Sequence, residues 1–137
     1  RAVGLIDLDT VKPGLVHYDI GDCLRSCCNP LGEETLQVEL VTFDLNLCRA
    51  ILEGYLTMGR SFLSDQDFRY LPDCIRLIPF ELGLRFLTDY LDGDRYFRTD
   101  RPSHNLDRAL VQFALTQSIE AQGDDLQLMI RELSGAS

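Results

Sequence analysis

The stretch Ala2-Val-Gly-Leu-Ile-Asp7-Leu-Asp9-Thr10 decides how the rest of this chain is interpreted. An apolar run, residues 2–6, leads directly into Asp7 and Asp9 and ends before a Pro13-Gly14 turn, which predicts a short β-strand or hairpin. Side chains alternate along a strand, so Asp7 and Asp9 are expected on the same side. Two neighbouring carboxylates suit Mg²⁺, which combines such ligands with substrate phosphates. The stretch therefore predicts a site for phosphoryl transfer; alternatively, both acids are solvated loop residues.

Two helices are expected in the first half of the chain. Apolar residues recur with helical spacing over residues 18–28, and Asp19 lies at or near the start of this helix. Asp44 is a good N-cap for a second helix, whose apolar stripe runs as far as Gly59. A loop with Pro30 separates the two helices.

The second half of the chain predicts further helices and completes a mainly α fold. Ser64 is expected to cap a short helix that Pro72 interrupts, because proline removes a backbone hydrogen bond. A long helix follows over about residues 73–91, bent at Pro79, and Gly93 then takes a left-handed cap conformation. Two more helices are expected over about residues 103–123 and 126–133.

Composition limits the classes of protein to which the chain can belong. Its 137 residues, 45% hydrophobic and 26% charged, suffice for one globular domain over residues 1–137. A net charge of −9 argues against sequence-independent binding of nucleic acid, which needs a basic surface. The sequence has no apolar stretch of membrane-spanning length, so no membrane partner is expected.

The cysteines and the first residues indicate where the protein resides and how much of it is present. None of the five cysteines has the spacing of a zinc site, which predicts reduced thiols in a cytoplasmic protein. The chain begins within the expected strand, without an initiator Met or a signal peptide, so we expect a truncated fragment.

Several of these segments resemble a known family. The segment 4–8, followed after a turn by 18–22, is similar to the metal-binding segment of the aminoglycoside phosphotransferase superfamily, small-molecule kinases with a protein-kinase-like fold. The segments 84–94 and 105–109 resemble signatures of its N-acetylhexosamine 1-kinase branch, whose relatives have also been labelled desulfatase-like. The resemblance implies a helical C-terminal lobe that uses ATP, Mg²⁺ and a small-molecule sugar. It also implies that the N-terminal lobe and the catalytic loop, with its general base, lie outside this chain.

The resemblance assigns roles to the acids near the start of the chain. Asp7 matches the carboxylate that holds the Mg²⁺ ion bound to the nucleotide. Asp9 either helps to bind the metal or caps the turn through backbone N–H groups. Asp19 matches a buried acid that orders the catalytic loop by accepting its N–H bonds; alternatively, it is a plain helix N-cap.

Two residues near the end of the long helix are implied to contact the sugar, namely Arg85 and Tyr96. Alternatively, Arg85 forms an ion pair with Asp89, one turn further along the helix. The segment 105–108 is expected to cap and pin the helix that follows.

A desulfatase label does not indicate sulfate-ester chemistry in this chain. Cys28-Asn-Pro-Leu-Gly32 resembles the start of a sulfatase motif, but Gly32 stands where that motif requires Arg.

Without its other lobe, the chain is expected to be inactive. It is also expected to self-associate through the unpaired edge of the first strand.

Overall fold

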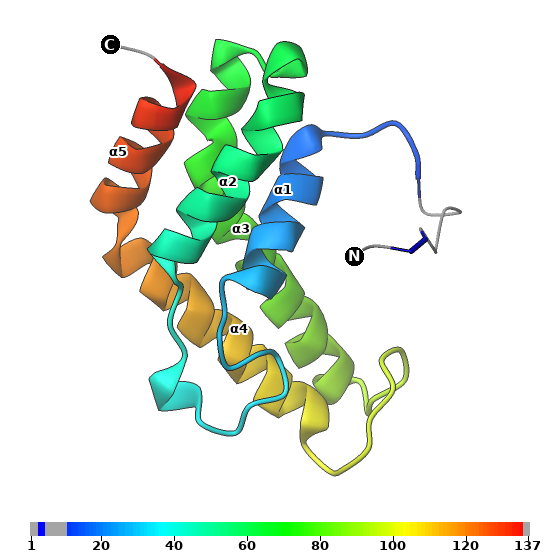
Figure 1. The fold of residues 1–137 in the computed structure, drawn as a ribbon. Helices are drawn as coiled ribbons and strands as arrows, with labels where there is room; N and C mark the ends of the chain where they lie inside the picture. The colour runs from blue at the N-terminus through cyan, green and yellow to red at the C-terminus, as the bar shows by residue number, and fades with distance from the viewer. Residues whose placement is uncertain (1–2, 5–10, 136–137) are drawn as a thin grey trace.

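The computed structural model describes residues 3–4 and 11–135 and is mainly α, as predicted (Figure 1). Of the expected strand, Val3 and Gly4 have no regular secondary structure, and the remainder, like Asp7 and Asp9, lies outside the described residues. The described residues form five α-helices and two short 3₁₀ helices: α1 (Val16–Cys27), η2 (Val38–Leu40), α2 (Leu45–Gly59), η3 (Arg60–Phe62), α3 (Asp65–Leu91), α4 (His104–Ala121) and α5 (Gly123–Ser134).

Helix α1 begins earlier than the sequence suggests. Leu15 is its N-cap residue and makes no side-chain capping bond, whereas Asp19 lies in the first turn. Asp19 is therefore near the start of the helix, as predicted, but the alternative that it is the N-cap is wrong. A carboxylate in the first turn still interacts favourably with the positive end of the helix dipole.

The next two caps follow the local sequence. The Asp44 side chain accepts hydrogen bonds from the N–H groups of Asn46 and Leu47, at 2.9 and 3.0 Å, and so starts α2 as predicted. Ser64 and Asp67 form a reciprocal capping box at the start of α3.

Helix α3 is continuous, so the prediction that Pro72 interrupts it is wrong. Its 27 residues include both Pro72 and Pro79. Each proline costs one backbone hydrogen bond, but α3 packs against α1, α4 and α5 along its length. Tertiary burial of one face offsets the local penalty. After Leu91 the helix ends as predicted, with Gly93 left-handed at φ +87°.

The core lies where α1, α4 and α5 pack against α3 and where α2 packs on α1 and α5, and α4 runs back along α3 in Figure 1. Two glycines allow close helix approach. A Cβ atom on Gly21 would lie 2.7 Å from Ile78 Cγ1, and one on Gly83 would lie 2.7 Å from Phe113 Cε1. Side chains in the core include Leu24, Cys48, Leu52, Ile75, Val111, Leu115, Ile119 and Leu126.

All five cysteines are free thiols, and Cys23 and Cys27 are exposed on α1. In the part of the chain that the structure describes, no helix has the length and apolarity required to span a bilayer.

Candidate ligand-binding site

The carboxylate of Asp89 organises the loop between α3 and α4. Asp89 lies in the last turns of α3 and is buried. Its Oδ1 atom accepts the N–H groups of Arg95 and Tyr96 at 2.9 and 2.8 Å, and Oδ2 accepts the N–H of Phe97 at 2.9 Å. Burial by itself would raise the pKa of Asp89, but these hydrogen bonds outweigh it and hold the pKa below its usual range.

Asn105 completes this arrangement from the first turn of α4. It is fully buried, and its Nδ2 group donates to Asp89 Oδ2 at 2.9 Å and to Asp94 Oδ1 at 2.8 Å. Asp94 follows Gly93, and both have positive φ, at +56° and +87°. Two consecutive left-handed residues reverse the chain, so the loop folds back over the end of α3. Asn105 thus pins the start of α4 to the end of α3, as expected for the segment 105–108. The expected capping by this segment is not found, because the N-cap residue is Ser103, which makes no side-chain capping bond.

The reversed loop brings Tyr96 and Phe97 beside Arg85. The Arg85 Cζ atom lies 5.8 Å from the Tyr96 ring centroid and 5.4 Å from that of Phe97. Phe97 in turn packs on buried Phe86, with ring centroids 4.6 Å apart. The expected proximity of Arg85 and Tyr96 is therefore found.

Arg85 has a different ionic partner from the one considered in the sequence. Its Nε atom lies 3.8 Å from Glu81 Oε1, one turn earlier in α3. Asp89 is committed to the loop backbone, so the alternative of an Arg85–Asp89 ion pair is wrong.

These residues border a shallow depression of about 480 Å³, which Glu81, Leu84, Thr88, Tyr96 and Phe97 line together with Arg85. Small-molecule sites commonly have volumes of roughly 300–1,000 Å³ and combine apolar walls with a few polar groups. A guanidinium whose face lies over aromatic rings keeps its N–H groups available at the edge. The depression can therefore offer cationic donors beside a phenol hydroxyl and aromatic faces.

Of the three acids near the start of the chain, only Asp19 lies among the described residues, and it does not line the Arg85 depression. Asp19 is exposed, so the expected burial is not found; it lies near Tyr55. Burial raises the pKa of Tyr55, and the charge of Asp19 adds to this effect. Among the residues that the structure describes, His, Cys, Asp and Glu form no group of three or more that could hold a metal ion.

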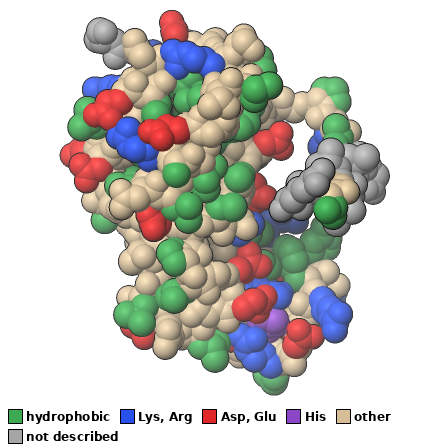
Figure 2. All heavy atoms as spheres, in the orientation of Figure 1, with side chains coloured by type: hydrophobic (Ala, Val, Ile, Leu, Met, Phe, Trp, Pro, Cys, Tyr) green, Lys and Arg blue, Asp and Glu red, His purple; other side chains and the backbone are tan. Residues whose placement is uncertain are grey.

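A second polar cluster holds the far side of the loop. Figure 2 shows acidic and basic side chains gathered around a His side chain at this end of the molecule. The His104 Nδ1 atom accepts the Asp100 N–H at 3.1 Å, so Nε2 carries the hydrogen and donates to Glu34. Arg108 also donates to Glu34 and, at 3.0 Å, to the Arg98 carbonyl. The cluster therefore ties the loop to the segment before α2.

The Glu34 cluster predicts a specific loss of stability in acid. Burial favours a higher pKa for Glu34, but the hydrogen bonds from His104 and Arg108 bring it below the usual 4.5. A lowered pKa in the folded state stabilises the protein above about pH 4.5, and this contribution disappears as pH falls through the folded pKa. Glu34→Gln should lower the melting temperature at pH 7 by a few degrees, because partly exposed pairs contribute under about 1 kcal/mol.

Thermal unfolding of Glu34→Gln and of the unmodified chain across pH 3–7 checks this expectation. The difference in melting temperature should narrow as pH falls below 4.5, through the lowered pKa of Glu34. Glu39→Gln is the matched control, because Glu39 is exposed and no ion pair to it is found in the described part of the chain. An equal difference at every pH would contradict the assignment.

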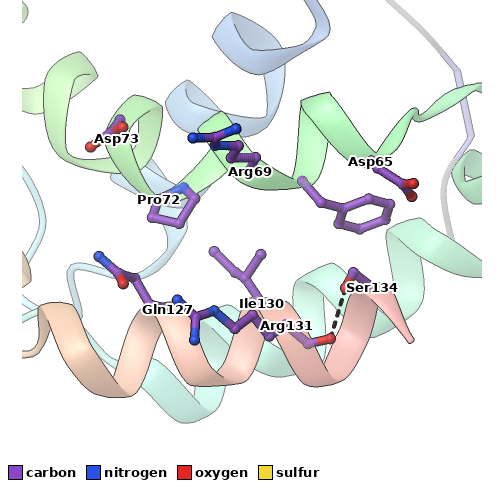
Figure 3. Close-up of a pocket in the computed structure, with 9 residues that line it drawn as sticks. Asp65, Arg69, Pro72, Asp73, Gln127, Ile130, Arg131 and Ser134 are labelled. Carbon is purple, nitrogen blue, oxygen red and sulfur yellow. Dashed lines mark hydrogen bonds between the residues drawn. The ribbon is translucent and has the colours of Figure 1, made fainter. Parts of the chain in front are cut away.

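Another hollow lies between α3 and α5, where Arg69 and Asp73 from one helix face Gln127 and Arg131 from the other (Figure 3). Opposite charges alternate along its α3 wall, since Asp65, Arg69 and Asp73 are four residues apart. The lining contains none of the predicted site residues. It is therefore a separate groove of balanced charge.

Sequence reasoning missed three contributors to the Arg85 depression, namely Glu81, Asp89 and Phe97. The pair Tyr96-Phe97 was a usable signal, because adjacent aromatic residues in a polar loop are expected to pack on something. The role of Asp89 had no such signal, since its partners are backbone groups six to eight residues later.

Fold and site together define a helical protein with a small-molecule-sized, polar and aromatic depression beside the end of its longest helix. No model of a known protein family matches the sequence.

Proposed function

We propose that this chain is the helical C-terminal lobe of an ATP- and Mg²⁺-dependent kinase that phosphorylates the anomeric hydroxyl of N-acetylhexosamines. The observation that carries the proposal is the pairing of Arg85 with Tyr96 at one depression. The sequence resemblance assigns sugar contacts to these two residues, which are 11 positions apart.

The carboxylates near the start of the chain support the proposal. Asp7 and Asp9 provide the carboxylate oxygens that Mg²⁺ prefers, two residues apart after an apolar run. Bound Mg²⁺ would neutralise charge on the phosphates, which is a major part of catalysis of phosphoryl transfer. This chain would supply Asp7 as the main ligand, with Asp9 as a second ligand or a turn cap.

Arg85 and Tyr96 would bind and orient the acceptor. An N-acetylhexosamine has an acetamido carbonyl that accepts hydrogen bonds and ring hydroxyls that donate and accept them. Arg85 offers donors, and the Tyr96 hydroxyl can do both. The Tyr96 and Phe97 rings, with centroids 5.8 and 5.4 Å from Arg85 Cζ, restrict the movement of the guanidinium, so less entropy is lost when the sugar binds.

The overall reaction transfers the γ-phosphoryl group of ATP to the sugar. A bond forms between phosphorus and the anomeric oxygen, the bond from phosphorus to the bridging oxygen of ADP breaks, and the hydroxyl proton passes to a base outside this chain. Catalysis of such a transfer depends mainly on positioning and charge neutralisation. Asp19 would order the loop that carries this base.

Two other functions remain as alternatives. A kinase of the same superfamily that acts on another hydroxylated small molecule would keep Asp7 and use the Arg85 depression differently. A noncatalytic helical binding module would leave the acids at the start of the chain without a catalytic role.

A substrate panel on the complete protein tests these functions, with ATP consumption as the readout. We expect consumption with N-acetylglucosamine or N-acetylgalactosamine, little with glucose, and none with the methyl glycoside of the same N-acetyl sugar, whose anomeric oxygen is blocked. Consumption with a different acceptor would favour the other kinase. No consumption with any acceptor would favour the binding module.

A further inference from the structure

We propose that Asp89 is a positioning residue that sets acceptor selectivity by fixing the backbone of residues 95–97, and with it the Tyr96 side chain beside Arg85. This inference rests on the proposed function. It concerns a residue that contacts the loop backbone and acts on the sugar through Tyr96 and Arg85.

The hydrogen bonds of Asp89 are the basis of the inference. A carboxylate has about four acceptor positions. Three are taken by the N–H groups of residues 95–97 and a fourth by Asn105 Nδ2, all between 2.8 and 2.9 Å. The carboxylate therefore has no position left for a sugar hydroxyl, although it lies under the depression.

The loop has separate anchors for its two halves. His104 Nδ1 accepts a hydrogen bond from the N–H of Asp100, and Arg108 donates one to the carbonyl of Arg98. These two bonds fix the second half of the loop to α4. The first half begins at Asp94, which Asn105 holds, and the backbone of residues 95–97 is held by Asp89 and by the packing of Phe97 on Phe86. Loss of the Asp89 charge should therefore release the first half and leave the second half in place.

Asp89→Asn is the sharpest substitution because it preserves the size of the side chain. One amide oxygen can still accept hydrogen bonds, but the amide nitrogen must take the place of Oδ1 or of Oδ2. At Oδ1 it faces the N–H groups of Arg95 and Tyr96, and at Oδ2 it faces the Phe97 N–H and Asn105 Nδ2, donor against donor in either case. The hydrogen bonds that hold residues 95–97 cannot all be kept. Tyr96 would then lose its fixed place next to Arg85.

The expected result in the complete enzyme is a change confined to the acceptor. The KM for N-acetylhexosamine should rise by about tenfold or more, the KM for ATP should stay within about twofold, and the preference over the plain hexose should fall. Amide hydrogen exchange should accelerate at residues 95–97 and stay slow in α4. Asp100→Asn, the same change in the same loop, should leave all of these values unaltered.

A double-mutant cycle separates positioning from general destabilisation. If Asp89 acts through Arg85 and Tyr96, Asp89→Asn should add little to the acceptor KM when Arg85→Ala is already present. Asn105→Ala removes one hydrogen bond to Asp89 and should give a smaller shift in the same direction. Asn105→Ala serves as the test in place of Asp89→Asn if the Asp89→Asn variant does not fold.

The outcomes distinguish failure of this inference from failure of the proposed function. If Arg85→Ala weakens acceptor use but Asp89→Asn or Asn105→Ala leaves it normal, Asp89 is structural only and the inference is wrong. Unchanged exchange at residues 95–97 also overturns it. If the unmodified enzyme does not phosphorylate N-acetylhexosamines at all, both proposals are wrong.

Discussion

Replacing Asp7 with Asn in the complete enzyme is expected to reduce turnover by about 1,000-fold while the fold stays intact. Asn keeps the shape of the side chain but removes the charge that would bind Mg²⁺ in the proposed kinase. The metal would neutralise charge that develops on the phosphates, so its loss should raise the barrier to transfer itself. Steady-state kinetics with ATP and N-acetylglucosamine, together with a thermal melt, measures both parts of the expectation.

Asp9→Asn is the matched control for Asp7. If Asp9 only caps the turn, this change should lower stability slightly and spare turnover; if it binds metal, turnover should also fall. The apparent Mg²⁺ requirement should shift to higher concentrations in any variant that weakens metal binding. Near-normal turnover by well-folded Asp7→Asn would remove Asp7 from the mechanism.

Arg85→Ala should weaken the use of N-acetylhexosamines by on the order of 100-fold, with ATP binding largely spared. A hydrogen bond from a charged donor to the substrate contributes roughly 1.5–3 kcal/mol, and each 1.4 kcal/mol corresponds to about tenfold. The Glu81 pair cannot account for such a loss, because Arg85 is 47% exposed and pairs of this kind contribute under about 1 kcal/mol. The ratio kcat/KM for the sugar, beside the KM for ATP, is the measurement.

Arg76→Ala provides a matched control on the same helix. Arg76 is similarly exposed and forms one ion pair, with Glu120 at 3.2 Å, but lies outside the Arg85 depression. It should change stability a little and kcat/KM hardly at all. Equal effects of the two substitutions would show that Arg85 contributes only to stability, and the sugar-site assignment would then be wrong.

Local signals predicted several features of the fold correctly. Asp44 caps α2 because its extended backbone places the carboxylate within reach of the unpaired N–H groups two and three residues later. The reversal at Gly93 follows from the low cost of positive φ at glycine. Both features depend only on neighbouring residues, so the sequence is sufficient to predict them.

Rules for local structure failed where distant segments supply the deciding contacts. Pro72 should end a helix by its own chemistry, yet α3 continues because α1, α4 and α5 bury its other residues. Asp89 is well placed to pair with Arg85 on an isolated helix. In the folded chain, the buried carboxylate of Asp89 needs donors, and the backbone N–H groups of the loop supply them in place of an exposed ion pair.

The sequence by itself therefore determined the mainly α class, the caps of α2 and α3 and the turn at Gly93, whereas the choice of Arg85 and Tyr96 as candidate site residues came from the resemblance of its motifs to a family. Helix periodicity and side-chain chemistry are local properties and can be read from neighbouring residues. Only the tertiary structure decided that Asp89 and Asn105 fold the loop back and bring Phe97 under Arg85. That outcome depends on which polar groups become buried together, and burial is a property of the whole folded chain.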